Sequence, residues 1–148
     1  MKHFLPIILI SMLMLCGCKD DTTLTEEAFV SCDTIDDGIE LSGIPIDVSD
    51  AFGDFSLNSV MVNGEDFIQL SYLANECELF IRKGHFDIDK LCDTKEPALK
   101  VDGKDIYLIR SKDTVTRAVW RTDDYSYFLN TSIGLTEDSI VRLIMQIN

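Results

Sequence analysis

The sequence predicts an α+β fold: an antiparallel sheet of about five to seven strands with a C-terminal helix packed on one face. Two observations support this prediction. Short runs in which apolar and polar residues alternate recur through the second half of the chain, separated by turn residues. Near the C-terminus the spacing of apolar residues changes to that of a helix. Residues 44–148 are therefore expected to form one domain, which suits a chain of 148 residues.

Three turn signals divide the expected strands into hairpins. They are Asn63-Gly64, Asp102-Gly103 and residues 122–124. An Asn-Gly or Asp-Gly pair between two β-rich runs is a strong signal for a tight hairpin. After the first turn, Ile68, Leu70 and Tyr72 alternate with polar residues and should share one face of a strand. Because the connections are short, neighbouring strands are expected to be antiparallel.

The last segment has the features of an amphipathic helix. Thr136 can cap its N-terminus, and Glu137 and Asp138 supply the negative charge that the helix dipole favours there. One apolar stripe follows at helical spacing, formed by Ile140, Leu143, Ile144 and Ile147. A helix with a single stripe needs one partner surface, and the apolar face of the sheet is the surface available.

Residues 1–17 are interpreted as a lipoprotein signal peptide. Lys2 and His3 precede an apolar run of twelve residues, 4–15, which rises only about 18 Å as a helix and is too short to span a bilayer. The run ends in Leu15-Cys16-Gly17-Cys18, which resembles the bacterial lipobox. Cys18 follows a small residue and is the expected lipidation site. The alternative is an ordinary cleaved signal followed by a chance cysteine.

Acyl chains on Cys18 would hold the protein at the cell membrane, facing outside the cytoplasm. Residues 18–43 are then expected to be an acidic linker between this anchor and the domain. The whole chain has a formal charge of −13, and removal of residues 1–17, with one lysine and no acidic residue, makes it −14. This excess of acid argues against binding to nucleic acid and against docking on anionic lipid.

Three cysteines remain beyond the expected leader: Cys32, Cys77 and Cys92. An odd number allows at most one intrachain bridge. A disulfide between Cys77 and Cys92 and a set of three free thiols are both compatible with the spacing. No C-x-x-C pair is present, so neither a zinc ribbon nor a thioredoxin-like redox site is predicted. We likewise expect no cofactor, since no glycine-rich phosphate-binding pattern occurs.

The stretch from 63 to 148 resembles an uncharacterised bacterial family, domain of unknown function four-three-six-seven. Four segments carry the likeness: Phe67-Ile-Gln-Leu-Ser-Tyr, Val101-Asp-Gly-Lys-Asp-Ile-Tyr, Ala118-Val-Trp-Arg-Thr-Asp-Asp-Tyr-Ser-Tyr and Leu135-Thr-Glu-Asp-Ser-Ile. The family occurs on secreted lipoproteins and on the outer parts of anti-sigma-factor-like membrane proteins. The resemblance implies a non-catalytic extracytoplasmic module, and it supplies no catalytic residue.

Candidate catalytic and metal-binding groups are few. His85 is the one histidine beyond the leader, and a nucleophilic pair would need Cys77 or Cys92 beside it. Asp87 and Asp89 would share a face if their segment were extended. No catalytic residue and no metal ligand is predicted, and the expected state of His85 is an exposed loop residue.

An acidic segment around Gly38 can be compared with a calcium-binding loop. Asp33, Asp36, Asp37 and Glu40 surround Gly38 and offer hard oxygen ligands. An EF-hand register centred on this glycine, however, puts isoleucine at two positions that need oxygen. We therefore interpret these acids as part of the linker.

Aromatic residues offer a further hypothesis. They are Tyr72, Tyr107, Trp120, Tyr125 and Tyr127, all in expected strands or beside a turn. Such side chains can line a groove for a sugar or a peptide, because each combines an apolar ring with a polar tip. Packing in the core is the favoured interpretation for those on the inward face.

Three functions remain open. The preferred one is a lipid-anchored, non-catalytic binding or sensing module that contacts an unknown envelope protein or ligand. A carrier of an apolar cargo would instead require a cavity of several hundred Å³ between sheet and helix. An envelope hydrolase would require a cleft in which two titratable groups converge.

Overall fold

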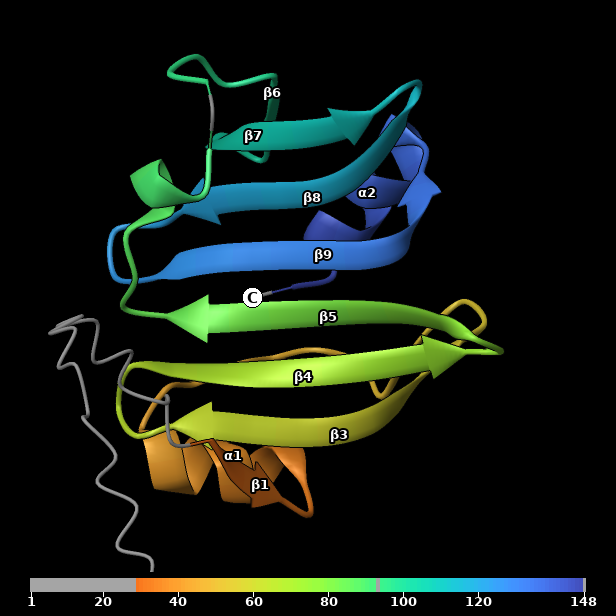
Figure 1. Ribbon diagram of the computed structural model, residues 1–148. Helices are drawn as coiled ribbons and strands as arrows, with labels where there is room; N and C mark the ends of the chain where they lie inside the picture. The colour runs from red at the N-terminus through yellow and green to blue at the C-terminus, as the bar shows by residue number, and fades with distance from the viewer. Residues whose placement is uncertain (1–28, 93, 148) are drawn as a thin grey trace, which may run out of the picture.

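The computed structural model describes residues 29–92 and 94–147 and confirms the α+β class (Figure 1). The elements, in chain order, are β1 (Val30–Cys32), α1 (Ile35–Ser42), β2 (Ala51–Phe52), β3 (Phe55–Asn63), β4 (Phe67–Ala74), β5 (Cys77–Gly84), the 3₁₀ turn η1 (Ile88–Lys90), β6 (Leu99–Val101), β7 (Lys104–Ser111), β8 (Thr114–Arg121), β9 (Ser126–Leu135) and α2 (Glu137–Ile144). Within the described residues the sheet has nine strands, so the expected five to seven was too few. The two strands that were not expected, β1 and β2, have three and two residues, too few to show an alternating pattern, whereas β6 is the expected first strand of the Asp102-Gly103 hairpin.

All strand pairs in the sheet are antiparallel, and the order is β1-β3-β4-β5-β9-β8-β7-β6, with β2 paired to β3. The strands β3, β4 and β5 follow one another as hairpins. The chain then passes through η1 to the far edge and returns as β6, β7, β8 and β9. As a result β9, the last strand, pairs with β5 in the middle of the sheet.

The predicted turns form where expected. Asn63 pairs with Phe67, and the three residues between them close the β3–β4 hairpin. Asp102 and Gly103 both have positive φ, 49° and 77°, which is the conformation that a two-residue type I′ turn requires. The third hairpin joins β8 to β9, with Thr122 donating its backbone N–H to the carbonyl oxygen of Tyr125.

One face of the sheet, the inner face, carries the core. Ile68, Leu70 and Tyr72 of β4 lie on it as predicted, and each is fully buried. The predicted stripe of the C-terminal helix packs into the same cluster. Thr136 caps α2 as expected, because its hydroxyl accepts a hydrogen bond from the backbone N–H of Ser139. Figure 1 shows α2 behind β8 and β9.

The segment 29–43 was expected to be linker, but it is folded against the sheet. Strand β1 pairs with β3, and α1 packs on β3 and β4. Within α1 only Gly38 and Ser42 are fully buried, so the helix offers the sheet a small contact surface. The dense acids hid this element, because an acidic segment with few apolar residues is typical of a linker.

The opposite face, the outer face, has a different composition. One row across six strands contains Met61, Gln69, Arg82, Phe128, Val119 and Tyr107. The adjoining row contains Ser71, Phe80, Asn130, Arg117 and Ile109. Neither row includes a carboxylate. Among the described residues no helix is long and apolar enough to cross a membrane.

Candidate functional site

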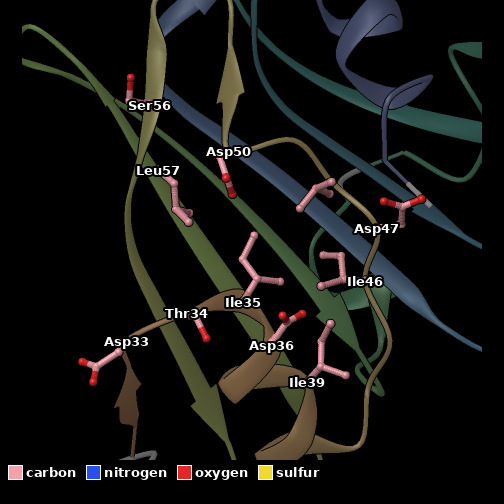
Figure 2. Close-up of a pocket in the computed structure, with 11 residues that line it drawn as sticks. Asp33, Thr34, Ile35, Asp36, Ile39, Ile46, Asp47, Asp50, Ser56 and Leu57 are labelled. Atoms are coloured by element: carbon pink, nitrogen blue, oxygen red, sulfur yellow. The ribbon is translucent and has the colours of Figure 1, made fainter.

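A hollow of about 630 Å³ lies beside α1 and is called here the acidic groove (Figure 2). It is lined by Asp33, Thr34, Ile35, Asp36, Ile39, Ile46, Asp47, Val48, Asp50, Ser56 and Leu57. These residues come from the N-terminal end of α1, from the segment 46–50 and from the start of β3. Three separate parts of the chain therefore form its walls.

The first wall is fixed by the N-terminus of α1. Asp37 accepts hydrogen bonds from the backbone N–H of Thr34 at 3.1 Å and from its hydroxyl at 2.7 Å. In return the Thr34 hydroxyl accepts from the backbone N–H of Asp37 at 3.1 Å. This reciprocal capping box satisfies helix donors that otherwise have no partner. Asp37 is thereby engaged in capping, whereas Asp36 lines the groove.

The second wall is the segment 46–50, which is tied to two strands. The hydroxyl of Tyr72 donates to the carbonyl oxygen of Ser49 at 3.0 Å, and the N–H of Leu57 donates to the carbonyl oxygen of Asp50 at 2.8 Å. Ile46, 6% exposed, anchors the start of the segment in the core. Burial, reinforced by the charge of Asp50, raises the pKa of Tyr72 above that of an ordinary tyrosine.

The groove combines an apolar floor with acidic edges. Its apolar side chains are all aliphatic: Ile35, Ile39, Ile46, Val48 and Leu57. Four carboxylates, those of Asp33, Asp36, Asp47 and Asp50, lie around them, and no lysine or arginine is among the lining residues. Aliphatic surface gains free energy by leaving water, whereas carboxylates favour cations, so this chemistry suits an amphipathic cation.

The acids that the calcium hypothesis considered are not brought together as a ligand set. Asp33 and Asp36 line the groove, Asp37 caps α1, and all three are exposed together with Glu40. Across residues 29–92 and 94–147, no group of three or more histidine, cysteine, aspartate or glutamate side chains is arranged to hold a metal ion.

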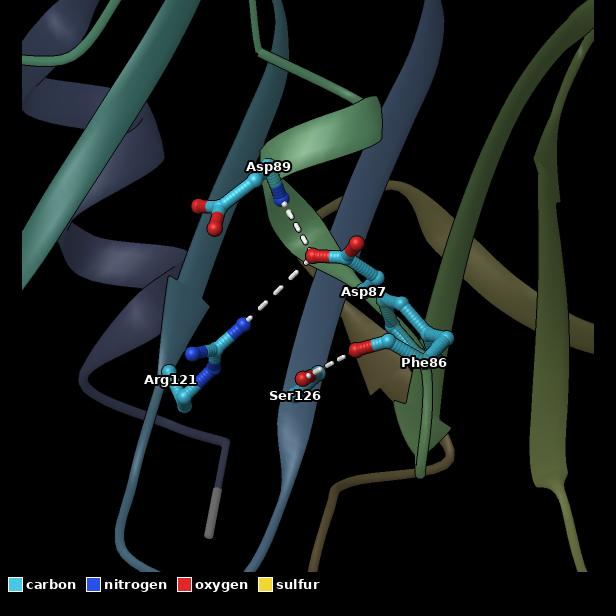
Figure 3. A network of polar contacts seen from close by, with 5 residues as sticks. All are labelled: Phe86, Asp87, Asp89, Arg121 and Ser126. Atoms are coloured by element: carbon cyan, nitrogen blue, oxygen red, sulfur yellow. Dashed lines mark hydrogen bonds and ion pairs between the residues drawn. The ribbon is translucent and has the colours of Figure 1, made fainter.

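A second polar region surrounds Arg121 at the end of β8 (Figure 3). Asp87 accepts a hydrogen bond from the backbone N–H of Asp89 at 3.0 Å and lies 3.9 Å from the Arg121 guanidinium. The hydroxyl of Ser126 donates to the carbonyl oxygen of Phe86 at 2.6 Å. Asp87 and Asp89 are thus part of a turn, not of an extended strand. These contacts hold the connection after β5 against β8 and β9.

His85 and Cys77, one of the two pairs that the hydrolase hypothesis considered, lie apart. His85 is an exposed loop residue, as expected, and its ring lies 5.1 Å from that of Tyr125. Cys77 is at the other end of β5, eight residues and about 26 Å away along an extended strand. Cys77 carries a free thiol, so it forms no bridge with Cys92 in this structure.

The distance that separates Cys77 from Cys92 follows from the topology. Cys77 begins β5, whereas Cys92 follows η1, which packs on β8 and β9 beyond the end of β5. A disulfide needs Cα atoms within about 7 Å of each other. Cys32, in β1, is also a free thiol, and burial raises its pKa above the usual value, with Asp37 and Asp33 adding to the rise.

Most of the aromatic residues belong to the core and form no groove. Trp120 and Tyr72 are fully buried, and Trp120 stacks on Tyr127 with 5.0 Å between ring centroids. Tyr107 and Tyr125 are half-buried. The aromatic-groove hypothesis therefore gains nothing from these positions, and the favoured core interpretation holds for Trp120, Tyr72 and Tyr127.

The groove itself was missed by sequence reasoning. Its signal was present in the alternation of Ile44, Ile46 and Val48 with exposed Pro45 and Asp47. Such alternation is typical of an extended segment with one buried face. This segment could be recognised as a wall of the groove only once α1 was known, and the sequence did not predict α1.

The predicted lipidation site, Cys18, lies outside the described residues, as does the whole expected signal peptide. Comparison of the chain with protein-family models, with curated proteins and with solved structures gives no match. The resemblance to the uncharacterised lipoprotein family gains no support from these comparisons.

Proposed function

We propose that the chain is a lipid-anchored extracytoplasmic lipoprotein that acts as a non-catalytic binding module of the cell envelope. The proposal rests on two independent observations. The leader ends in the lipobox-like Leu15-Cys16-Gly17-Cys18, which supports anchoring through Cys18. The folded part carries the acidic groove, whose size and chemistry support binding of a segment from a partner.

The acidic groove is the observation that carries the binding role. Burying one aliphatic side chain on its floor contributes about 1.5–3 kcal/mol. An exposed contact between a carboxylate and a cation adds only about 0.2–1 kcal/mol. Most of the binding free energy therefore comes from the apolar floor. The four carboxylates favour a positively charged group beside the bound apolar side chain, and they increase the rate of association. The favoured partner is a protein segment in which lysine or arginine flanks an apolar side chain.

Binding to the groove can be tested with defined probes. A short labelled peptide in which lysine alternates with leucine is compared with its serine–leucine and lysine–serine counterparts by fluorescence anisotropy. We expect the lysine–leucine peptide to bind best, and the double change Asp36→Asn with Asp47→Asn to weaken it severalfold. The matched control, Asp113→Asn with Asp123→Asn, alters the net charge equally but lies outside the groove. If the two double variants lost affinity for the peptide equally, the groove would be refuted as the binding element.

The anchor needs its own test. In cells, Cys18→Ala should abolish incorporation of labelled palmitate and release the protein from the membrane fraction. Cys16→Ala is the matched control, and it should leave both unchanged. Palmitate that persists on the Cys18→Ala chain would disprove this site.

A second candidate, a carrier of an apolar cargo, is favoured by one smaller hollow. About 370 Å³ lies between α2 and the turn from β2 to β3, with Phe52, Phe55, Leu135 and Leu143 among its lining residues. An apolar fluorescent probe separates the two functions. Tight binding that Leu143→Gln abolishes, with no affinity for the lysine–leucine peptide, would favour the carrier.

A further inference from the structure

The outer face of the sheet is the second surface of interest, and neither α-helix of the described residues packs on it. Both helices lie on the inner side, where their buried side chains join the core. On the outer side η1 and its flanking residues cover the end near Ser126. The centre of the face is formed by Arg82, Arg117, Phe80, Phe128 and Asn130, here called the arginine face. It lies across the sheet from α1 and its groove, and the inference does not depend on the proposed function.

Arg82 is held in a defined position on this face. Its Nε and Nη2 atoms both donate to Oε1 of Gln69, at 3.1 and 2.8 Å. The centre of its guanidinium group lies 4.0 Å from the centroid of the Phe67 ring, within cation–π distance. These contacts fix the Arg82 side chain on the outer face, beside Phe128 on the neighbouring strand.

Arg117 is exposed and offers a second positive charge. Its Nε atom donates to Oδ1 of Asn130 at 3.2 Å, which orients the side chain across the neighbouring strand. Among the described residues, no carboxylate lies within ion-pair distance of Arg117, whereas Arg110 pairs with Glu137 and Arg121 with Asp87. An arginine without a nearby carboxylate is notable in this chain, because its 26 acidic residues outnumber its 13 basic residues.

The aromatic rings between the two arginines restrict the class of partner. Phe80 and Phe128 meet edge to face, with centroids 5.5 Å apart and planes at 62°. Tilted rings offer no flat platform for a sugar, but they can contact an apolar side chain. A long polyanion is disfavoured as well, because the net charge of −13 repels it everywhere else. A short segment with a few carboxylates suffers much less of this repulsion.

We propose that the arginine face is a docking surface for an acidic, amphipathic segment of a partner protein. A carboxylate of the segment contacts Arg117, and an apolar side chain beside it packs on Phe80 and Phe128. Charge complementarity favours such a segment, and arginine and aromatic residues are enriched in protein interfaces. The net charge of −13 adds selectivity, since a segment with the same sign of charge is repelled from the acidic parts of the protein surface.

The test uses the folded chain without its leader and a labelled peptide in which glutamate alternates with leucine. Arg117→Gln is expected to weaken its binding about tenfold, the equivalent of about 1.4 kcal/mol. Arg117→Lys retains the charge and should recover part of the affinity. The matched control is Arg142→Gln, which changes the net charge equally on exposed α2 and should leave binding unchanged. Thermal unfolding of each variant verifies the fold.

Each outcome decides the proposal. The proposal is supported if Arg117→Gln loses affinity for the peptide while Arg142→Gln does not, and if the amide chemical shifts of β5 and β9 change when the peptide is added. Equal affinity in Arg117→Gln and Arg142→Gln, or no binding of the peptide at all, overturns it. Binding of an anionic polysaccharide that depends on Arg117, in the absence of peptide binding, assigns the face to another class of ligand and also overturns it.

Discussion

The hydroxyl of Tyr72 donates a hydrogen bond to the backbone carbonyl oxygen of Ser49 at 3.0 Å, and this contact joins the core of the sheet to the wall of the acidic groove. Tyr72 is fully buried in β4, and its ring meets that of Phe52 edge to face at 5.0 Å. Ser49 belongs to the segment 46–50, which has no regular secondary structure of its own. The shape of the groove therefore depends on a side chain that does not line it.

Tyr72→Phe tests this dependence. The change keeps the ring in place but leaves the carbonyl oxygen of Ser49 without its donor, which we expect to cost about 1–2 kcal/mol in the free energy of unfolding. Urea titration measures the loss. Affinity for the lysine–leucine peptide should fall as well, and an affinity equal to that of the unchanged chain would show that the wall holds its shape without Tyr72.

The same tyrosine predicts a loss of stability in alkali. Burial raises the pKa of Tyr72 in the folded state, so the unfolded state releases this proton at a lower pH than the folded state does. The contribution of Tyr72 is therefore complete below about pH 10, the ordinary tyrosine value, and declines as pH rises above it. Tyr72→Phe should show a shallower decline between about pH 10 and 11. Parallel curves for the two chains would contradict this account.

Thr34→Ala removes the cap of α1. The backbone N–H of Asp37 loses its acceptor, and a typical loss of this kind costs about 1 kcal/mol. Thr34→Ser keeps the hydroxyl and serves as the control, with stability expected close to that of the unchanged chain. Chemical denaturation measures the free energy of unfolding of the unchanged chain and of both variants. The prediction fails if Thr34→Ala and Thr34→Ser are equally stable.

Gly38→Ala probes the close approach of α1 to the sheet. A Cβ atom at this position would lie 2.7 Å from Cγ1 of Val60 and 2.9 Å from Cδ1 of Ile68, closer than normal contact allows. Alanine favours a helix by up to about 1 kcal/mol over glycine, but overpacking costs about 1–3 kcal/mol. We expect a net loss in unfolding free energy, while Glu40→Ala, on the exposed side, should change stability little. A stabilised Gly38→Ala chain would show that α1 can move outward freely.

Ile144→Asp tests the contact between α2 and the sheet. Ile144 is 1% exposed, and a carboxylate there would be buried without a partner. The loss should exceed about 4 kcal/mol and unfold much of the protein at room temperature. Met145→Asp is the matched control, because Met145 is 65% exposed and its replacement should be tolerated. Circular dichroism during heating distinguishes the two.

The hairpins and the C-terminal helix could be predicted because their signals are local. Asp102-Gly103 requires the positive φ angles of its turn, and Thr136 caps α2 within three residues of its partner Ser139. The pairing of β5 with β9 could not be predicted in this way. It joins Leu79 to Thr131, and no short-range pattern specifies a contact between residues so far apart.

The acidic groove shows the same limit at the N-terminus. The two fully buried residues of α1, Gly38 and Ser42, are too small to mark an apolar stripe, and the acids of this helix resemble those of a linker. Its position is fixed by the sheet, since Gly38 fits against Val60 and Ile68 only after β3 and β4 have paired. The capping box of Thr34 and Asp37 is local, but the place of this helix in the fold depends on tertiary packing.

The central ladder between β5 and β9 has a consequence for biosynthesis. A chain that lacks residues 126–135 would leave β5 with an unpaired hydrogen-bonding edge, because β9 is the partner of β5 on that side. Such an edge invites pairing with other chains, so premature termination within β9 should yield fragments that aggregate instead of shorter functional proteins. In the finished fold, two strand meanders are joined along the single ladder between β5 and β9.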